Sequence, residues 1–246
     1  MPICIFCRGA TAGTEGLAHV LPEAVIHNSA TLPRGAVCDN CNQYLGSLDE
    51  MLVRTPTVAV CVQFYGFPGK RGKPRVEVGG INRQKRPDGQ INMQFPVTPT
   101  GAEVAEDGKH TVHVALGPPT SFNMLKFRRA LHHVALNFLA ASLGEETALG
   151  SEFDAVRRYV RQPKPREAWS YAEGQVPEDR PRPIGVRWLP AGETVPVVAM
   201  DLGIQTFVVG LYPDIDLAPV AARHGLELIE AARREPQWAH LTYRES

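Results

Sequence analysis

The chain has 246 residues, of which 43% are hydrophobic, and its acidic and basic side chains balance to a formal net charge of zero. This length predicts one large domain or two small ones, with enough apolar residues for a sizeable core. No apolar run reaches the roughly 18 residues of a membrane span, and the N-terminus lacks the pattern of a secretory signal. We therefore expect a cytoplasmic protein with no membrane partner.

Residues 1–50 contain two Cys-x-x-Cys pairs, with Cys4 and Cys7 in the first and Cys38 and Cys41 in the second. Two such pairs have the spacing of one tetrahedral zinc site, and this cysteine usage favours a reducing compartment over a disulfide framework. We expect the four thiolates to hold one structural Zn²⁺. A unit with so few large apolar residues should depend on that metal for its folding.

Three elements are predicted before residue 55. A short strand is expected over residues 18–21, and residues 27–36 are expected to form a loop. Apolar residues at helical spacing predict a helix over residues 38–54; they are Leu45, Leu48 and Leu52.

Residues 57–117 are predicted to form β-strands joined by turns, with a hairpin turn at residues 86–89. The expected strands are 57–65, 74–78, 91–96 and 111–116. Cys61, the fifth cysteine, lies in the first of these and is interpreted as a buried, unreactive thiol.

A basic stripe occupies residues 70–86, where seven basic residues and one acidic residue give a net charge of +6. Such a stripe can neutralise the phosphates of a nucleic acid and release counterions. A solvated hairpin with basic tips explains the same composition, so both interpretations stay open. The residues that we assign to DNA contact are Lys70, Arg71, Lys73, Arg83, Lys85 and Arg86.

The remainder is predicted to contain three helices and three strands. The helices are expected from Ser121 to about residue 143, over 152–160 and over 219–234, and the strands over 184–189, 195–201 and 206–211. His132 and His133 are interpreted as ordinary, partly exposed residues of the first helix. Residues 162–183 contain five prolines and four acidic residues, which predict a long surface linker.

The N-terminal pattern resembles the zinc-containing branch of the HNH endonuclease family, the ββα-metal nucleases. The resemblance rests on CIFC, AHVLP and CDNCN, and Leu45-Gly46 with Asp49 continue it. It implies an α+β protein in which a small zinc-stapled ββα-metal module, residues 1–55, precedes a larger mixed α/β domain, residues 56–246.

The same resemblance implies roles for two residues and raises a problem at a third. His19 would be the general base, and Asn42 would offer its carbonyl oxygen to a catalytic Mg²⁺ or Mn²⁺. Active family members place a metal-binding Asp, Glu or His where this chain has Ala18, which has no donor atom. Glu15 and Glu23 lie near His19, but neither takes the same place on a strand. Either activity is weakened or lost, or the alanine was introduced to trap a nuclease on its substrate.

The function that we expect is metal-dependent hydrolysis of DNA phosphodiesters, with a bacterial defence setting suggested by family association alone. A non-catalytic zinc-containing DNA-binding module is the second hypothesis. The third is a protein-interaction scaffold with a purely structural zinc. The larger domain is a candidate DNA reader, dimerisation surface or regulator, which leaves a homodimer open.

Overall fold

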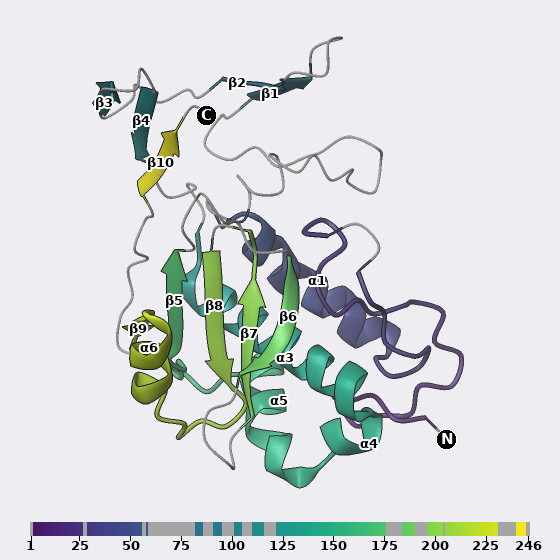
Figure 1. The fold of residues 1–246 in the computed structure, drawn as a ribbon. Helices are drawn as coiled ribbons and strands as arrows, with labels where there is room; N and C mark the ends of the chain where they lie inside the picture. Colours follow the sequence, from purple (N-terminus) through teal and green to yellow (C-terminus); the bar gives the residue numbers. More distant parts are fainter. Residues whose placement is uncertain are drawn as a thin grey trace.

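The structure is a computed structural model that describes residues 2–26, 29–55, 58, 82–85, 91–94, 101–104, 110–115, 122–175, 184–189, 196–203, 205–230 and 240–244. Helices and sheets are both present, and every strand pair in these ranges is antiparallel (Figure 1). The predicted α+β class is therefore confirmed.

The N-terminal residues form turns, short bridges and one long helix. Helix α1 spans Asp39–Val53, with Cys38 as its N-cap, so the helix predicted over 38–54 is confirmed. The strand predicted over residues 18–21 is reduced to an antiparallel bridge between His19 and Thr31. Thr31 lies in the segment that was expected to be a loop. The chain therefore contributes two short extended segments and then a helix.

Helix α3, Met124–Leu143, lies at the centre of the fold. Its start at Ser121 was predicted wrongly, because Asn123 caps the helix and its side chain accepts the N–H of Lys126 at 2.9 Å. Gly144 ends it as expected, with a φ of 92°. Most residues of α3 are buried on all sides of the helix, as is typical of a helix enclosed by other elements.

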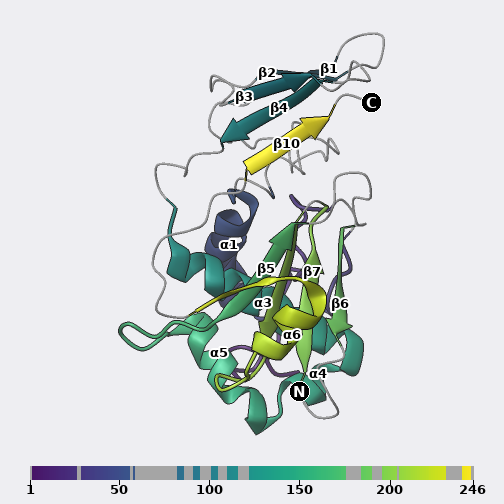
Figure 2. The same ribbon diagram turned by 60° about the vertical axis from the view of Figure 1, so that its left-hand side comes forward.

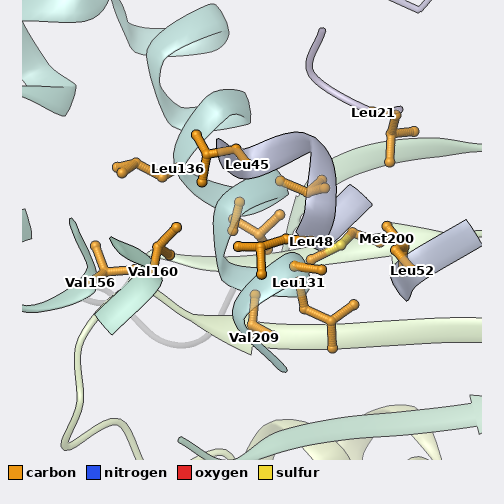
Figure 3. Packing of buried hydrophobic residues seen from close by; sticks show 14 of the residues in the cluster. Leu21, Leu45, Leu48, Leu52, Leu131, Leu136, Val156, Val160, Met200 and Val209 are labelled. Atoms are coloured by element: carbon orange, nitrogen blue, oxygen red, sulfur yellow. The ribbon is translucent and has the colours of Figure 1, made fainter. Parts of the chain in front are cut away.

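Three neighbours enclose α3. Helix α1 packs on one side and helix α5, Asp154–Arg161, on another, and a sheet covers a third side. Figure 3 shows the shared core; its labelled residues include Leu45 and Leu48 of α1, Leu131 and Leu136 of α3, Val160 of α5 and Val209 of the sheet. Between α3 and α5 lie helix α4, Glu145–Ala148, and a 3₁₀ turn, Ser151–Phe153.

The sheet beside α3 has five antiparallel strands in the order β6-β7-β8-β5-β9. They are β5 Tyr171–Gln175, β6 Gly185–Leu189, β7 Val197–Asp201, β8 Gln205–Gly210 and β9 Glu227–Ile229. One face packs on α3, and helix α6, Ala218–His224, covers the other (Figure 2). Because both faces are covered, β7 and β8 are buried along their whole length, which explains the apolar runs at residues 197–200 and 207–209.

Three predictions for the C-terminal half are wrong. The predicted linker over residues 162–183 contains strand β5, whose Tyr171 is buried. The helix predicted over 219–234 ends at His224, because Gly225 adopts a left-handed φ of 64° and the chain turns into β9. His132 and His133 are buried, with 1% and 5% of their surface exposed.

Two smaller sheets complete the described strands. Strands β1, Asn82–Lys85, and β2, Ile91–Gln94, pair antiparallel on either side of the predicted turn. Strands β3 Gly101–Val104, β4 His110–Ala115 and β10 His240–Arg244 form a sheet in the order β10-β4-β3. Of the predicted strand over 57–65 the structure describes only Val58, which is buried and helical rather than extended. The predicted strand over 74–78 lies outside the described residues, as do Cys61, Lys70, Arg71, Lys73 and Arg86. Arg83 and Lys85 lie in β1, where the backbone alone is described.

One hydrophobic cluster joins the N-terminal segment to the rest of the molecule. It includes Ile5 and Phe6, the inner face of α1, α3, α5 and one face of the sheet. The boundary predicted at residue 55 follows the end of α1 at Val53, but the core continues across it. The N-terminal segment thus packs on α3 as part of one core.

None of the described helices combines the length and the apolar character that crossing a membrane requires.

Candidate metal centre and the His19 site

The four paired cysteines meet at one point. The Sγ atoms of Cys4, Cys7, Cys38 and Cys41 all lie within 4.8 Å of one another, and those of Cys7 and Cys38 are 3.7 Å apart. Tetrahedral Zn–S bonds of about 2.3 Å place two sulfurs about 3.8 Å apart, whereas a disulfide needs about 2.05 Å. All four are free thiols. They therefore form a cluster that can bind a metal such as zinc.

Two tight turns direct these sulfurs inward. The N–H of Gly9 donates to Sγ of Cys7 at 3.4 Å, and the N–H of Cys41 donates to Sγ of Cys38 at 3.4 Å. Arg8 adopts a left-handed φ of 57° to complete the first turn. A Cβ on Gly9 would lie 3.3 Å from the Cys7 sulfur, so glycine keeps this approach open. Such N–H···S bonds favour the thiolate form that binds metals.

The thiols also share protons within the cluster. The hydrogen bond with Cys41 lowers the pKa of Cys4 to about 4, and the same hydrogen bond raises the pKa of Cys41. Burial raises the pKa of Cys7. Metal binding requires the sulfurs as thiolates, so a divalent cation that binds here would displace the protons that remain on the cluster.

The cysteine cluster is the single group of its kind in the part of the chain that the structure describes. No other set of three or more His, Cys, Asp or Glu side chains within those ranges is arranged to hold a metal ion. A second centre for Mg²⁺ or Mn²⁺ beside His19 therefore stays a proposal. Glu15, one candidate replacement ligand, is exposed, and its backbone N–H donates to Asp39 at 3.3 Å.

The chain that leads into His19 is fastened to the first turn of α1. Oδ1 of Asp39 accepts the N–H of Gly16 at 3.0 Å, and Nδ2 of Asn42 donates to the carbonyl of Leu17 at 3.4 Å. The Asn42 side chain therefore lies beside the segment that runs into Ala18 and His19. Because Nδ2 makes this contact, Oδ1 is the atom of Asn42 that remains for a cation.

Burial alternates along the His19 segment. Ala18 is 6% exposed and Val20 is also buried, whereas His19 between them is half-buried. Ala18 belongs to the hydrophobic cluster, so it faces the core. Nδ1 of His19 is buried and has no hydrogen-bond partner among the described residues. Nε2 is therefore the nitrogen through which this ring can meet water or a phosphate.

A buried polar chain, which the sequence pattern did not predict, reaches His19 from α3. Nδ2 of Asn137 donates to the carbonyl of His19 at 2.9 Å and lies 2.9 Å from Nε2 of His133. Nδ1 of His133 in turn lies 3.0 Å from Oδ1 of Asp49 on α1, although the contact departs from good hydrogen-bond geometry. The available signal was a histidine and an asparagine at i and i+4 in a helix whose buried residues are mostly apolar.

Comparison with protein-family models, with curated proteins and with solved structures finds no match to this chain.

Proposed function

We propose that the protein is a metal-dependent DNA endonuclease whose ββα-metal module occupies its N-terminal segment. The observation that carries the proposal is the position of Asn42. Helix α1 begins at the four-cysteine cluster, and Asn42 in its first turn bonds to the chain just before Ala18 and His19. An extended segment with His19, a second one with its bridge partner Thr31, and a helix with Asn42 follow the order of such a module.

The residues suit phosphodiester hydrolysis. Nε2 of His19 can take a proton from the attacking water, a step that contributes about 10²–10⁴-fold in rate when the base is well placed. Oδ1 of Asn42 is an oxygen ligand of the kind that Mg²⁺ prefers. A bound cation would supply charge stabilisation at the scissile phosphate and at the leaving oxygen.

Ala18 weakens the proposed site because it offers no metal ligand. Its burial means that a carboxylate in its place would have to be desolvated. A carboxylate introduced at residue 18 would enter a mostly apolar environment, at a cost of several kcal/mol unless a cation pairs with it. The zinc-loaded Ala18→Glu protein should therefore be less stable than the unchanged protein when neither Mg²⁺ nor Mn²⁺ is added. Mg²⁺ or Mn²⁺ should restore part of that loss, because a ligand that binds the folded state stabilises it.

One observation favours a second candidate function, a non-catalytic zinc-containing DNA-binding module. Ala18 offers no donor atom where a cation would be needed, while the cysteine cluster requires no further ligand. In that case the module would bind DNA without cleaving it.

Nicking and binding assays with supercoiled plasmid DNA distinguish these functions. The unchanged protein and the Ala18→Glu variant, both loaded with zinc, are incubated with plasmid in Mg²⁺, in Mn²⁺ and without either cation, and DNA binding is measured at several salt concentrations. The endonuclease proposal expects divalent-metal-dependent nicking that rises in Ala18→Glu. Salt-sensitive binding without nicking in either protein would favour the non-catalytic module. The absence of both DNA binding and nicking would favour a protein-interaction scaffold.

A further inference from the structure

Two buried atoms close to the proposed site lack partners, and their chemistry is complementary. Nδ1 of His19 and Oδ1 of Asn137 are both buried without a hydrogen bond to any described residue. The two residues are already in contact, because Nδ2 of Asn137 donates to the backbone carbonyl of His19 at 2.9 Å. An imidazole N–H is a donor and an amide oxygen is an acceptor, so one bond between them would satisfy both costly buried groups.

The orientation of the Asn137 amide follows from its neighbours. A backbone carbonyl can only accept hydrogen bonds, so the Asn137 atom that faces the His19 carbonyl must be the nitrogen. The second hydrogen of Nδ2 is then directed to Nε2 of His133 at 2.9 Å. Oδ1 is left as the free end of the amide, and it is an acceptor.

The same reasoning fixes the proton on His133. Because Nε2 of His133 accepts from Asn137, the neutral ring carries its proton on Nδ1. That nitrogen lies 3.0 Å from Oδ1 of Asp49, a carboxylate that can accept it. His133 on α3 therefore holds the Asn137 amide in one orientation, and Asp49 on α1 lies beside the protonated nitrogen of His133 without good hydrogen-bond geometry.

We propose that Asn137 is a positioning residue for His19. Oδ1 of Asn137 and Nδ1 of His19 are not bonded to each other in the structure, and a small adjustment of the two side chains would let Oδ1 accept the Nδ1–H. Its Nδ2 fixes the His19 backbone, and its Oδ1 selects the tautomer in which Nε2 carries a lone pair towards the open side. The catalytic meaning of this contact rests on the proposed nuclease function, whereas the hydrogen bond itself does not. Helix α3, at the centre of the fold, then also orients the imidazole of His19, the proposed base on the N-terminal segment.

Nuclear magnetic resonance of the whole zinc-loaded chain tests the tautomer directly. Histidine is labelled with ¹⁵N, and long-range ¹H–¹⁵N correlation is recorded above the usual imidazole pKa of about 6.5. The His19 signals are assigned by their loss in His19→Gln. We expect the Nδ1–H form in the unchanged protein and the Nε2–H form or a mixture in Asn137→Leu. His132→Phe, a change at another buried position of α3, should leave the His19 signals as they are.

Either spectrum can overturn the proposal. An Nε2–H form of His19 in the unchanged protein would overturn it without any variant. The proposal can therefore be tested even if Asn137→Leu does not fold. An unaltered His19 tautomer in a folded Asn137→Leu protein would also overturn it. Zinc content and melting temperature establish that the variant is folded.

Kinetics in the Ala18→Glu background separate this inference from the proposed function. Asn137→Leu should lower kcat by at least about tenfold with little change in KM, because it misaligns the base while leaving the DNA-binding residues in place. Cleavage by Ala18→Glu with an unchanged tautomer and kcat in the Asn137→Leu double variant would overturn the role of Asn137 and leave the nuclease standing. The expected tautomers without any cleavage would overturn the nuclease and leave the hydrogen bond standing.

Discussion

The N–H of Cys41 donates to the sulfur of Cys38 at 3.4 Å, so Cys38 both caps helix α1 and belongs to the four-cysteine cluster. A metal in the cluster would therefore fix the start of α1 as well as the turn that carries Cys4 and Cys7. Farther along, the inner face of α1 packs on α3. The helix is thus anchored at one end by the metal site and along its length by apolar packing.

Zinc should be present at one ion for each chain, and Cys38→Ser should lose it. Serine is a good N-cap, so the variant keeps the cap of α1 and loses only the metal ligand. Without the metal, the protein should unfold over residues 1–50 and melt at a lower temperature. Elemental analysis gives the metal content, and thermal unfolding followed by circular dichroism gives the melting temperature.

Cys61→Ser is the matched control for the metal content, since Cys61 is the cysteine outside the two Cys-x-x-Cys pairs. It should keep the metal. Protein purified without zinc, or a Cys38→Ser protein that melts like the unchanged one, would contradict the assignment of the cluster as a structural metal site.

Stability should depend on pH through His132. Its ring packs edge-on against Tyr159 and Trp169, at centroid distances of 5.3 and 5.1 Å. Burial lowers the pKa of His132 from 6.5 to about 4. At pH values between about 4 and 6.5, His132 binds a proton in the unfolded chain but not in the folded chain. The contribution of His132 to the free energy of unfolding should therefore fall as pH decreases from about 6.5 to 4, by up to about 1.4 kcal/mol for each pH unit.

His132→Phe isolates this effect, because phenylalanine fills the aromatic site and does not titrate. Urea unfolding of both proteins at several pH values in that window gives the two free-energy curves. The unchanged protein should lose more stability than the variant as the pH falls. Parallel curves would mean that His132 does not carry this pH dependence.

The basic stripe should bind the DNA backbone without reading its sequence. Changing Arg83, Lys85 and Arg86 to alanine should weaken binding to all sequences alike. The log–log salt dependence should flatten by roughly one unit for each phosphate that the variant no longer neutralises. Fluorescence anisotropy with several duplexes across a salt series measures both effects.

A charge-matched variant with alanine at Lys126, Lys164 and Arg166, all exposed, serves as the comparison. It also removes three positive charges, but from outside the stripe, and it should change the slope of the log–log salt dependence less. Equal slopes for the stripe variant and the unchanged protein would identify the stripe as a solvated hairpin.

Local pattern was enough to predict much of the fold. The leucine spacing of α1, the long α3 with Gly144 after it and the strands β6, β7 and β8 are all visible in the sequence, because each follows from periodicity or capping. The cysteine spacing likewise predicted the cluster that the structure brings together.

Non-local contacts account for what the sequence did not predict. Strand β5 lies between prolines and charged residues that are typical of a linker, and it becomes a strand by pairing with β8 and β9. Asn137 contacts the His19 carbonyl across 118 positions of sequence. No local pattern pairs two such residues, and His133 and Asp49 likewise come from separate helices.

The most direct test of the nuclease account is the single-turnover rate of DNA cleavage in Ala18→Glu with and without His19. His19→Ala in that background should lower the rate by about 10²-fold or more, because no other group replaces the base. His224→Ala, which removes an exposed histidine from α6, should leave the rate unchanged. Metal-dependent cleavage by Ala18→Glu that His19→Ala abolishes is the result the account predicts. Equal rates with and without His19, or no cleavage by a folded, zinc-loaded Ala18→Glu protein, would contradict it.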